Sequence, residues 1–193
     1  MTCPVLVGCE ESQVLTKAFR DKGIEAYSCD VQPTRGNPGW HFQADIFDVI
    51  PISRWSLIVL HPDCTAMALS GNRWYGQGMP LHSKRKQAVA WTIALWELAL
   101  SYSDRVALEN PASVIFPHLP GVQYIQPWQF GHGETKKTGF ARHGLPELSP
   151  TQIVEGREPR IWKMPPSPTR KRDRSATFPG IAAAIADQWG GVI

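Results

Sequence analysis

Length and composition predict a single folded domain. The chain has 193 residues, of which 42% are hydrophobic and 19% charged, and these proportions exclude a chain that is disordered throughout. It contains no stretch of eighteen apolar residues, and its first residues lack the basic and then apolar pattern of a signal peptide. We therefore expect one domain over residues 1–193, in a soluble cytoplasmic protein without a membrane segment, as a monomer or homodimer.

The net charge of +3 is small but unevenly distributed along the chain. Residues 136–174 contain ten Lys or Arg side chains and only four Asp or Glu side chains. Such a basic segment favours a polyanionic partner, although many charge runs are only solvated loops. Its densest cluster is the run Arg170-Lys171-Arg172.

The four cysteines are expected to be reduced and to hold no metal. They stand at positions 3, 9, 29 and 64 and include no C-x-x-C pair. That distribution matches neither a disulfide framework nor the usual ligand spacing of a zinc site.

The first thirty residues predict the opening of a parallel α/β sheet. Residues 4–9 are a short apolar run typical of a buried strand. Ser12 is placed to cap a helix that ends at Gly23, and residues 24–29 form a second strand that ends at Asp30. In such a sheet the loops that follow the strands gather along one edge.

Further strands and one long helix follow. A weak strand is expected around Phe42 and a fully buried one over residues 56–61. Ser83 is placed to cap a helix through residue 101 that is apolar nearly all round, so we expect it to be buried against the sheet. Residues 106–109 make the next strand.

The second half of the chain predicts a loop region and a closing helix. Residues 117–179 contain ten of the seventeen prolines and no convincing helix, so loops and short antiparallel strands are expected. We assign residues 116–174 to a reduced recognition region and residues 175–189 to the closing helix. Between the strands at 56–61 and 106–109, a long Gly-rich loop with Arg73 and aromatic residues is expected to be mobile and to contact bases.

Polar residues at the strand ends predict a nucleoside site. Asp30 is placed to accept hydrogen bonds from a ribose diol, and Asp45 from an adenine amino group. The turn that begins at Gly8 has one glycine and no G-x-G-x-x-G pattern, so a ligand without phosphates is favoured. The alternative is that both aspartates only cap turns.

Two further residues suggest covalent chemistry. Cys64 follows the most hydrophobic strand, and a thiol needs help to ionise at neutral pH, for which His61 is well placed. Glu109 ends the next strand, where a partly dry site can raise the pKa of an acid. Cys64 and Glu109 would lie on neighbouring strands and face the pocket of Asp30 and Asp45. The alternatives are a small buried cysteine and a turn-capping glutamate.

Together these residues resemble the DNA cytosine-5 methyltransferases, over most of residues 4–115 and the last helix. The run Pro62-Asp63-Cys64 is similar to the family's proline-cysteine motif, and Glu109-Asn110 to its Glu-Asn-Val motif, with Pro111 in place of valine. The family's glycine-rich turn is replaced by residues 9–12. Residues 136–142 stand where the family has its Gln-x-Arg motif. The chain also resembles short methyltransferase-like proteins of phages.

The resemblance implies an α/β fold, namely a Rossmann-like S-adenosylmethionine-dependent methyltransferase sheet with a small basic, Pro-rich loop lobe. It implies C5-methylation of cytosine in DNA through a covalent Cys64 adduct with base flipping. The residues expected to act are Cys64, Glu109 and Arg142 in catalysis, Cys9, Glu10, Ser12, Asp30, Asp45 and His61 in cofactor binding, and Arg73, Lys136, Lys137, Arg170, Lys171 and Arg172 in nucleic-acid binding.

Two alternatives remain open at this point. The same cysteine addition would serve modification of RNA or of a free cytidine nucleotide. The second alternative is a noncatalytic nucleic-acid-binding protein that kept the methyltransferase shape.

Overall fold

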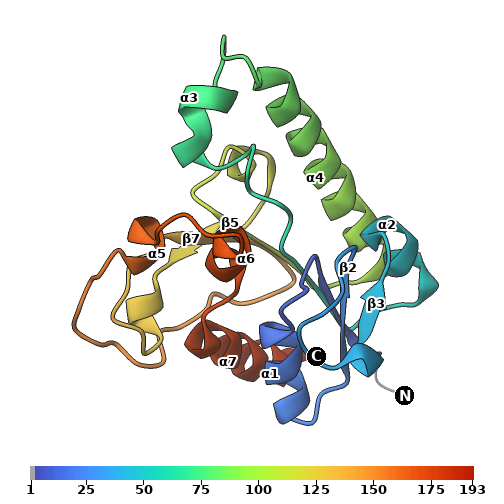
Figure 1. Ribbon diagram of the computed structural model, residues 1–193. Coiled ribbons are helices and arrows are strands. Elements are labelled where there is room, and N and C mark those ends of the chain that lie inside the picture. The colour runs from blue at the N-terminus through green and yellow to red at the C-terminus, as the bar shows by residue number, and fades with distance from the viewer. Residues whose placement is uncertain (1–2) are drawn as a thin grey trace.

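The protein is built on one mixed seven-stranded sheet. The computed structural model describes residues 3–193, apart from the side chains of Trp162 and Lys171, so the expected contact of Lys171 lies outside the described residues. The strand order is β3-β2-β1-β4-β5-β7-β6 (Figure 1). The strands are β1 Val5–Gly8, β2 Ala26–Asp30, β3 His41–Gln43, β4 Leu57–Leu60, β5 Val106–Pro111, β6 Gln123–Ile125 and β7 Thr138–His143.

The first five strands are parallel, and β7 runs antiparallel to both β5 and β6. The predicted α/β class is therefore confirmed, as are all five strands expected before residue 110. Because β1 to β5 are parallel, their carboxyl ends meet at one edge of the sheet. The order reverses at β1, between β2 and β4, which is where ligand sites of open α/β sheets form.

Helices cover both faces of the sheet. Helices α1 and α7 pack together on one face, and α2 and α4 contact the other (Figure 1). The helices are α1 Val14–Asp21, α2 Ile46–Val49, α3 Asn72–Tyr75, α4 His82–Tyr102, α5 Arg160–Lys163, α6 Arg170–Ser175 and α7 Pro179–Gln188, with 3-10 turns at Pro38–Trp40, Ile50–Ile52, Leu69–Gly71, Phe116–His118, Pro127–Gln129 and Gly190–Val192. Among the described residues, no helix is both long and apolar enough to span a membrane.

Alternation along the central strands creates two cores. Val5 and Val7 face α1 and α7, whereas Leu6 between them faces the side of α2 and α4. Successive side chains of a strand point to opposite faces, so a strand covered on both sides must be apolar throughout. All four residues of β4 are buried for this reason.

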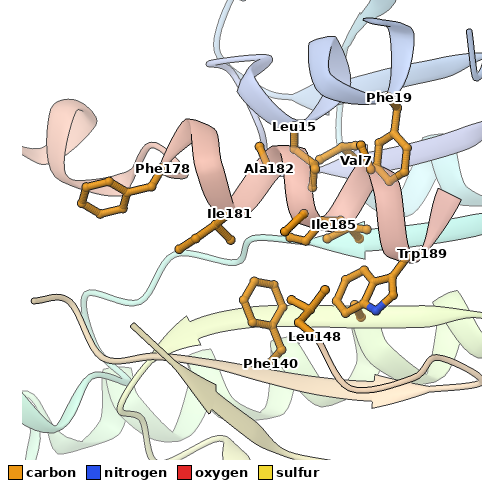
Figure 2. Packing of buried hydrophobic residues seen from close by; sticks show 14 of the residues in the cluster. Val7, Leu15, Phe19, Phe140, Leu148, Phe178, Ile181, Ala182, Ile185 and Trp189 are labelled. Atoms are coloured by element: carbon orange, nitrogen blue, oxygen red, sulfur yellow. The ribbon is translucent and has the colours of Figure 1, made fainter. Parts of the chain in front are cut away.

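The closing helix joins the two halves of the chain in one core. Ile185 and Trp189 pack beside Leu15 and Phe19 of α1 on one side, and beside Phe140 of β7 on the other (Figure 2). Trp189 is fully buried, meets Phe140 edge to face, and donates its indole N–H to a backbone carbonyl. The Pro-rich region that contains β7 therefore shares its core with the first helix.

The expectations about helices are corrected in several places. The residue that precedes α1 is Gln13; the Ser12 hydroxyl accepts from the Val14 N–H at 3.4 Å, and Glu10 holds the next two amides. Helix α4 begins at His82 without a side-chain cap from Ser83, and it is not buried all round, because Trp91 on its outer face is 41% exposed. The Pro-rich region also contains two short helices, α5 and α6.

Replacing Trp189 with alanine should lower the free energy of unfolding by about 3–5 kcal/mol, because a large cavity opens between α1, α7 and β7. The control is Trp74→Ala, since Trp74 is 52% exposed and its loss should cost about 0.5 kcal/mol or less. Urea unfolding followed by far-UV circular dichroism measures both. Equal losses for the two variants would contradict this packing.

Candidate functional site

The cysteine and the glutamate expected to act together lie at the same edge of the sheet. Strands β4 and β5 are parallel neighbours with Leu60 opposite Leu108, so the residues that follow them leave the sheet side by side. Glu109 is inside β5, and its side chain is only 13% exposed. Cys64 lies four residues beyond β4, half-buried and close enough for its pKa to be raised by the charge of Glu109.

His61 contacts the glutamate directly. Its Nδ1–H donates to Glu109 Oε2 at 3.3 Å, and the His61 side chain is 10% exposed. The second ring nitrogen, Nε2, is buried and has no hydrogen-bond partner within the described part of the chain. Burial tends to raise the pKa of Glu109, but the hydrogen bond from His61 and the charges of Lys136 and His61 outweigh it, so this pKa is lowered.

Lys136 brings a positive charge to the same place from the loop before β7. Its charge acts on both Cys64 and Glu109, and its Nζ donates to the carbonyl of Arg174 at the end of α6 at 3.1 Å. Burial, Glu109 and Asp63 raise the pKa of the Cys64 thiol, and Lys136 opposes them. Lys136, expected to contact nucleic acid, is therefore beside the two reactive residues.

Arg142 is not brought to this edge. It pairs with Ala107 near the start of β5, whereas Lys136 and Lys137 precede the residue opposite Pro111. Its guanidinium donates to the carbonyl of Leu145 and to Glu147. Within residues 136–142, which stand where the family has its Gln-x-Arg motif, Lys136 and not Arg142 is the basic residue whose charge acts on Cys64.

A buried arginine fixes the segment that follows Cys64. Arg85 of α4 donates to the carbonyls of Ala66 and Ala68 at 2.7 and 3.1 Å and to Asn72 Oδ1 at 2.7 Å. The Cys64 carbonyl also accepts from the backbone N–H groups of residues 67 and 68. The segment expected to be a mobile loop is thus tied to α4 and carries the helical turn α3.

Sequence reasoning missed Arg85, although a signal for it exists. Arg85 stands seven residues before Thr92 and fourteen before Ala99, and all three are buried on one face of α4. A basic residue at the period of the buried face indicates a structural role, because a charge is buried only when it is paired or hydrogen-bonded.

In the turn after β1, the Glu10 side chain folds back onto the first amides of α1. Glu10 is 5% exposed, and its carboxylate accepts from the N–H groups of Leu15 and Thr16 and from the Thr16 hydroxyl. Ser12 lies beside it, with its hydroxyl 3.5 Å from Glu10 Oε1. Cys9 adopts a positive φ of 60°, which turns the chain sharply as it leaves β1. Glu10 thus satisfies the N-terminal amides of α1 that a ligand would otherwise meet.

The two aspartates lie at the ends of neighbouring strands, as expected. Asp30 ends β2, half-buried, and accepts from the backbone N–H of Gln32. Asp45 follows β3 and caps α2 through the N–H of Phe47. Burial raises the pKa of the Cys9 thiol first, and the charges of Asp30 and Asp45 raise it further. These carboxylates therefore converge on the turn after β1, while Asp45 also serves as a helix cap.

Two basic surfaces flank this edge. The first, which we call the arm, consists of residues 69–86, that is, α3 and the first turn of α4, which extend away from the sheet (Figure 1). No Asp or Glu occurs between residues 64 and 96. The arm exposes basic and large apolar side chains together, namely Leu69, Arg73, Trp74, Met79, Lys84 and Lys86.

The second basic surface is α6 with the loop before β7. Arg172 is exposed, whereas Arg170 is half-buried and donates to the carbonyl of Met164. Lys137 is exposed and lies over the ring of Tyr124 at 4.3 Å. Asp173 of α6 also faces Arg35, at 3.8 Å. Helix α6 therefore adjoins both the loop after β2 and, through Lys136, the reactive pair.

The ionisation of Cys64 should follow the charges around it. Lys136→Gln removes the opposing cation and should raise the pKa of the thiol further, whereas Glu109→Gln removes a like charge and should lower it. The rate of alkylation of Cys64 by iodoacetamide, read at its own peptide by mass spectrometry as a function of pH, measures both shifts. Identical profiles for the two variants would show that neither charge reaches Cys64.

Comparison with known proteins supports the fold. No protein-family model and no curated protein matches the sequence. Among solved structures, a protein described as a candidate DNA modification methyltransferase from an E. coli prophage has a TM-score of 0.50 at 10% identity, over 80% of this chain and 52% of that one. The Entamoeba histolytica methyltransferase EhMeth has a TM-score of 0.53 at 14% identity, over 83% of this chain and 59% of that one. The chain thus matches little more than half of each of these proteins, and it has the methyltransferase-like fold that its sequence predicts.

Proposed function

We propose that the protein transfers a methyl group from S-adenosylmethionine to C5 of a cytosine base in DNA. One observation carries this proposal: Cys64 and Glu109 follow neighbouring strands at the carboxyl edge of β4 and β5, and Lys136 is near enough for its charge to act on both. A thiol, a buried carboxyl group and a cation in one place are the groups that addition to a pyrimidine ring requires.

The residues after β1, β2 and β3 fit the nucleoside part of this cofactor. Asp30 is half-exposed at a strand end, where a carboxylate can accept from a ribose diol, and Asp45 follows the adjacent strand. Their negative charges also suit a sulfonium cation. Glu10 does not fit direct contact with the cofactor, because its carboxylate is buried and holds α1. We assign Asp30 and Asp45 to binding, and when bound the cofactor supplies an electrophilic methyl group.

Cys64 acts on the base in the proposed reaction. Its thiolate adds to C6 and supplies the electron pair of the new S–C6 bond, which makes C5 nucleophilic. Glu109 donates a proton to N3 as negative charge develops on the ring, and Lys136 lies near enough to stabilise that charge. Loss of the C5 proton after methyl transfer then expels Cys64 and restores the aromatic ring.

The covalent step can be tested by trapping. DNA that contains 5-fluorocytosine should form a stable adduct with the wild-type protein in the presence of S-adenosylmethionine, because fluorine at C5 blocks the final elimination. Cys64→Ala should form none, and Cys3→Ala, which removes an exposed thiol elsewhere, is the control that retains Cys64. Denaturing electrophoresis and mass spectrometry detect the adduct. If the protein binds both ligands but no adduct forms, the fold serves binding alone; adducts with RNA only would change the substrate.

The arm should bind the phosphates of this substrate. The triple variant Arg73→Ala, Lys84→Ala and Lys86→Ala should weaken binding to a DNA duplex, and it should reduce the slope of log affinity against log salt by about one for each side chain that binds a phosphate. The control removes three exposed basic side chains elsewhere, Lys17, Lys22 and Arg54. Fluorescence anisotropy over a range of salt concentrations measures both. Equal slopes for the two triple variants would exclude the arm from the interface.

A further inference from the structure

His61 contacts one buried carboxylate of the site and acts on a second through its charge. It follows β4 directly, and its Nδ1–H donates to Glu109 Oε2; burial raises the pKa of Glu10, which the positive charge of protonated His61 lowers. Glu10 belongs to the turn after β1 and Glu109 to β5, while Lys136 acts on Glu109 from the loop before β7. The Nε2 atom of His61 is buried and has no hydrogen-bond partner in the described part of the chain, so Glu109 is its ring's hydrogen-bond partner there.

The proposed reaction needs a proton on the Glu109 carboxyl group, but the surroundings of Glu109 in the resting protein favour its ionised form. Glu109 must donate to N3 of the base, yet the hydrogen bond from His61 and the charge of Lys136 favour the ionised carboxylate. An ionised carboxylate has no proton to donate. Glu109 therefore requires a proton source within hydrogen-bonding distance, and His61 at 3.3 Å is such a group.

We propose that His61 stores the proton that Glu109 delivers to the base. This inference rests on the proposed function. As Cys64 adds to C6, the imidazolium gives its Nδ1 proton to Glu109 Oε2, and Glu109 gives a proton to N3. The imidazolium becomes neutral imidazole, the carboxylate ends unchanged, and the base gains one proton. When Cys64 is expelled, N3 returns the proton by the same path, so nothing is consumed.

In this role His61 is a positioning residue that supplies a proton through Glu109. One substitution, His61→Asn, distinguishes proton storage from a purely structural role. In His61→Asn, the amide can still donate a hydrogen bond to Glu109, but it cannot carry a proton in this pH range. A structural role would therefore be rescued by asparagine, whereas the storage role would not.

The first test needs no catalytic activity. The ring nitrogens of His61 are titrated by 15N NMR in the wild-type protein and in Glu109→Gln, with the exposed His118 as the internal control. Removing the carboxylate takes away the acceptor of the Nδ1 proton at 3.3 Å, so the titration of His61 should move to lower pH and that of His118 should stay the same. A His61 midpoint that is the same in both proteins would overturn the proposal.

The second test places His61 and Glu109 in one double-mutant cycle. His61→Asn should reduce methyl transfer to DNA by about tenfold or more, on the scale of a lost proton-transfer group, and move the alkaline limb of the pH–rate profile to lower pH. In Glu109→Gln, which should itself cut turnover by about 10²-fold, adding His61→Asn should cost nothing further. If the two losses multiply, His61 does not act through Glu109.

The outcomes separate the two proposals. If the wild-type protein transfers no methyl group, the proposed function is wrong. If Glu109→Gln leaves turnover unchanged, the role of Glu109 is wrong. In both cases the NMR titration still shows whether His61 and Glu109 share a proton. If Glu109→Gln is slow and His61→Asn is as fast as wild type with an unchanged pH profile, the function stands and proton storage by His61 is overturned.

Discussion

The parallel pairing of β4 with β5 is the constraint on which the rest of the site depends. Both strands are covered by helices on their two faces, so β4 and the first three residues of β5 are apolar. Polar groups come only toward the carboxyl ends of these strands, at the edge of the core. His61 and Cys64 follow β4 and Glu109 lies in the second half of β5, and the register between the strands decides that they are neighbours.

The electrostatics of the edge are unusual, because acidic groups outnumber cations around a thiol. Glu109 and Asp63 oppose the ionisation of Cys64, whereas the positive charge of Lys136 favours it. A thiol in such surroundings stays protonated and unreactive until the balance changes. Burial also opposes the thiolate, and the positive charge of Lys136 offsets these effects only in part.

The sequence predicted the strands well and the side-chain contacts less well, for a physical reason. The short apolar runs at β1, β4 and β5 determine both strand position and sheet edge, so the proximity of Cys64 and Glu109 could be expected in advance. The partners of Arg85 and Lys136 could not, because they are backbone carbonyls and charges distant in sequence, although the spacing along α4 does indicate that Arg85 is buried. Glu10 shows a further limit: the same residue after β1 could face a ligand or turn inward, and the positive φ angles of Cys9 and Gln13 turn it inward.

The Pro-rich region has a consequence for how such a protein can change its target. By composition it is a surface lobe, yet it contributes β7 to the sheet, Phe130 and Phe140 to the core, and Lys136 to the reactive edge. A separate domain can be exchanged between proteins because few contacts cross its boundary. Here the contacts that cross include the helix that closes the molecule. Under the proposed function, new specificity would arise from point changes at exposed positions, since transplanting the whole segment would remove β7, part of the core and Lys136.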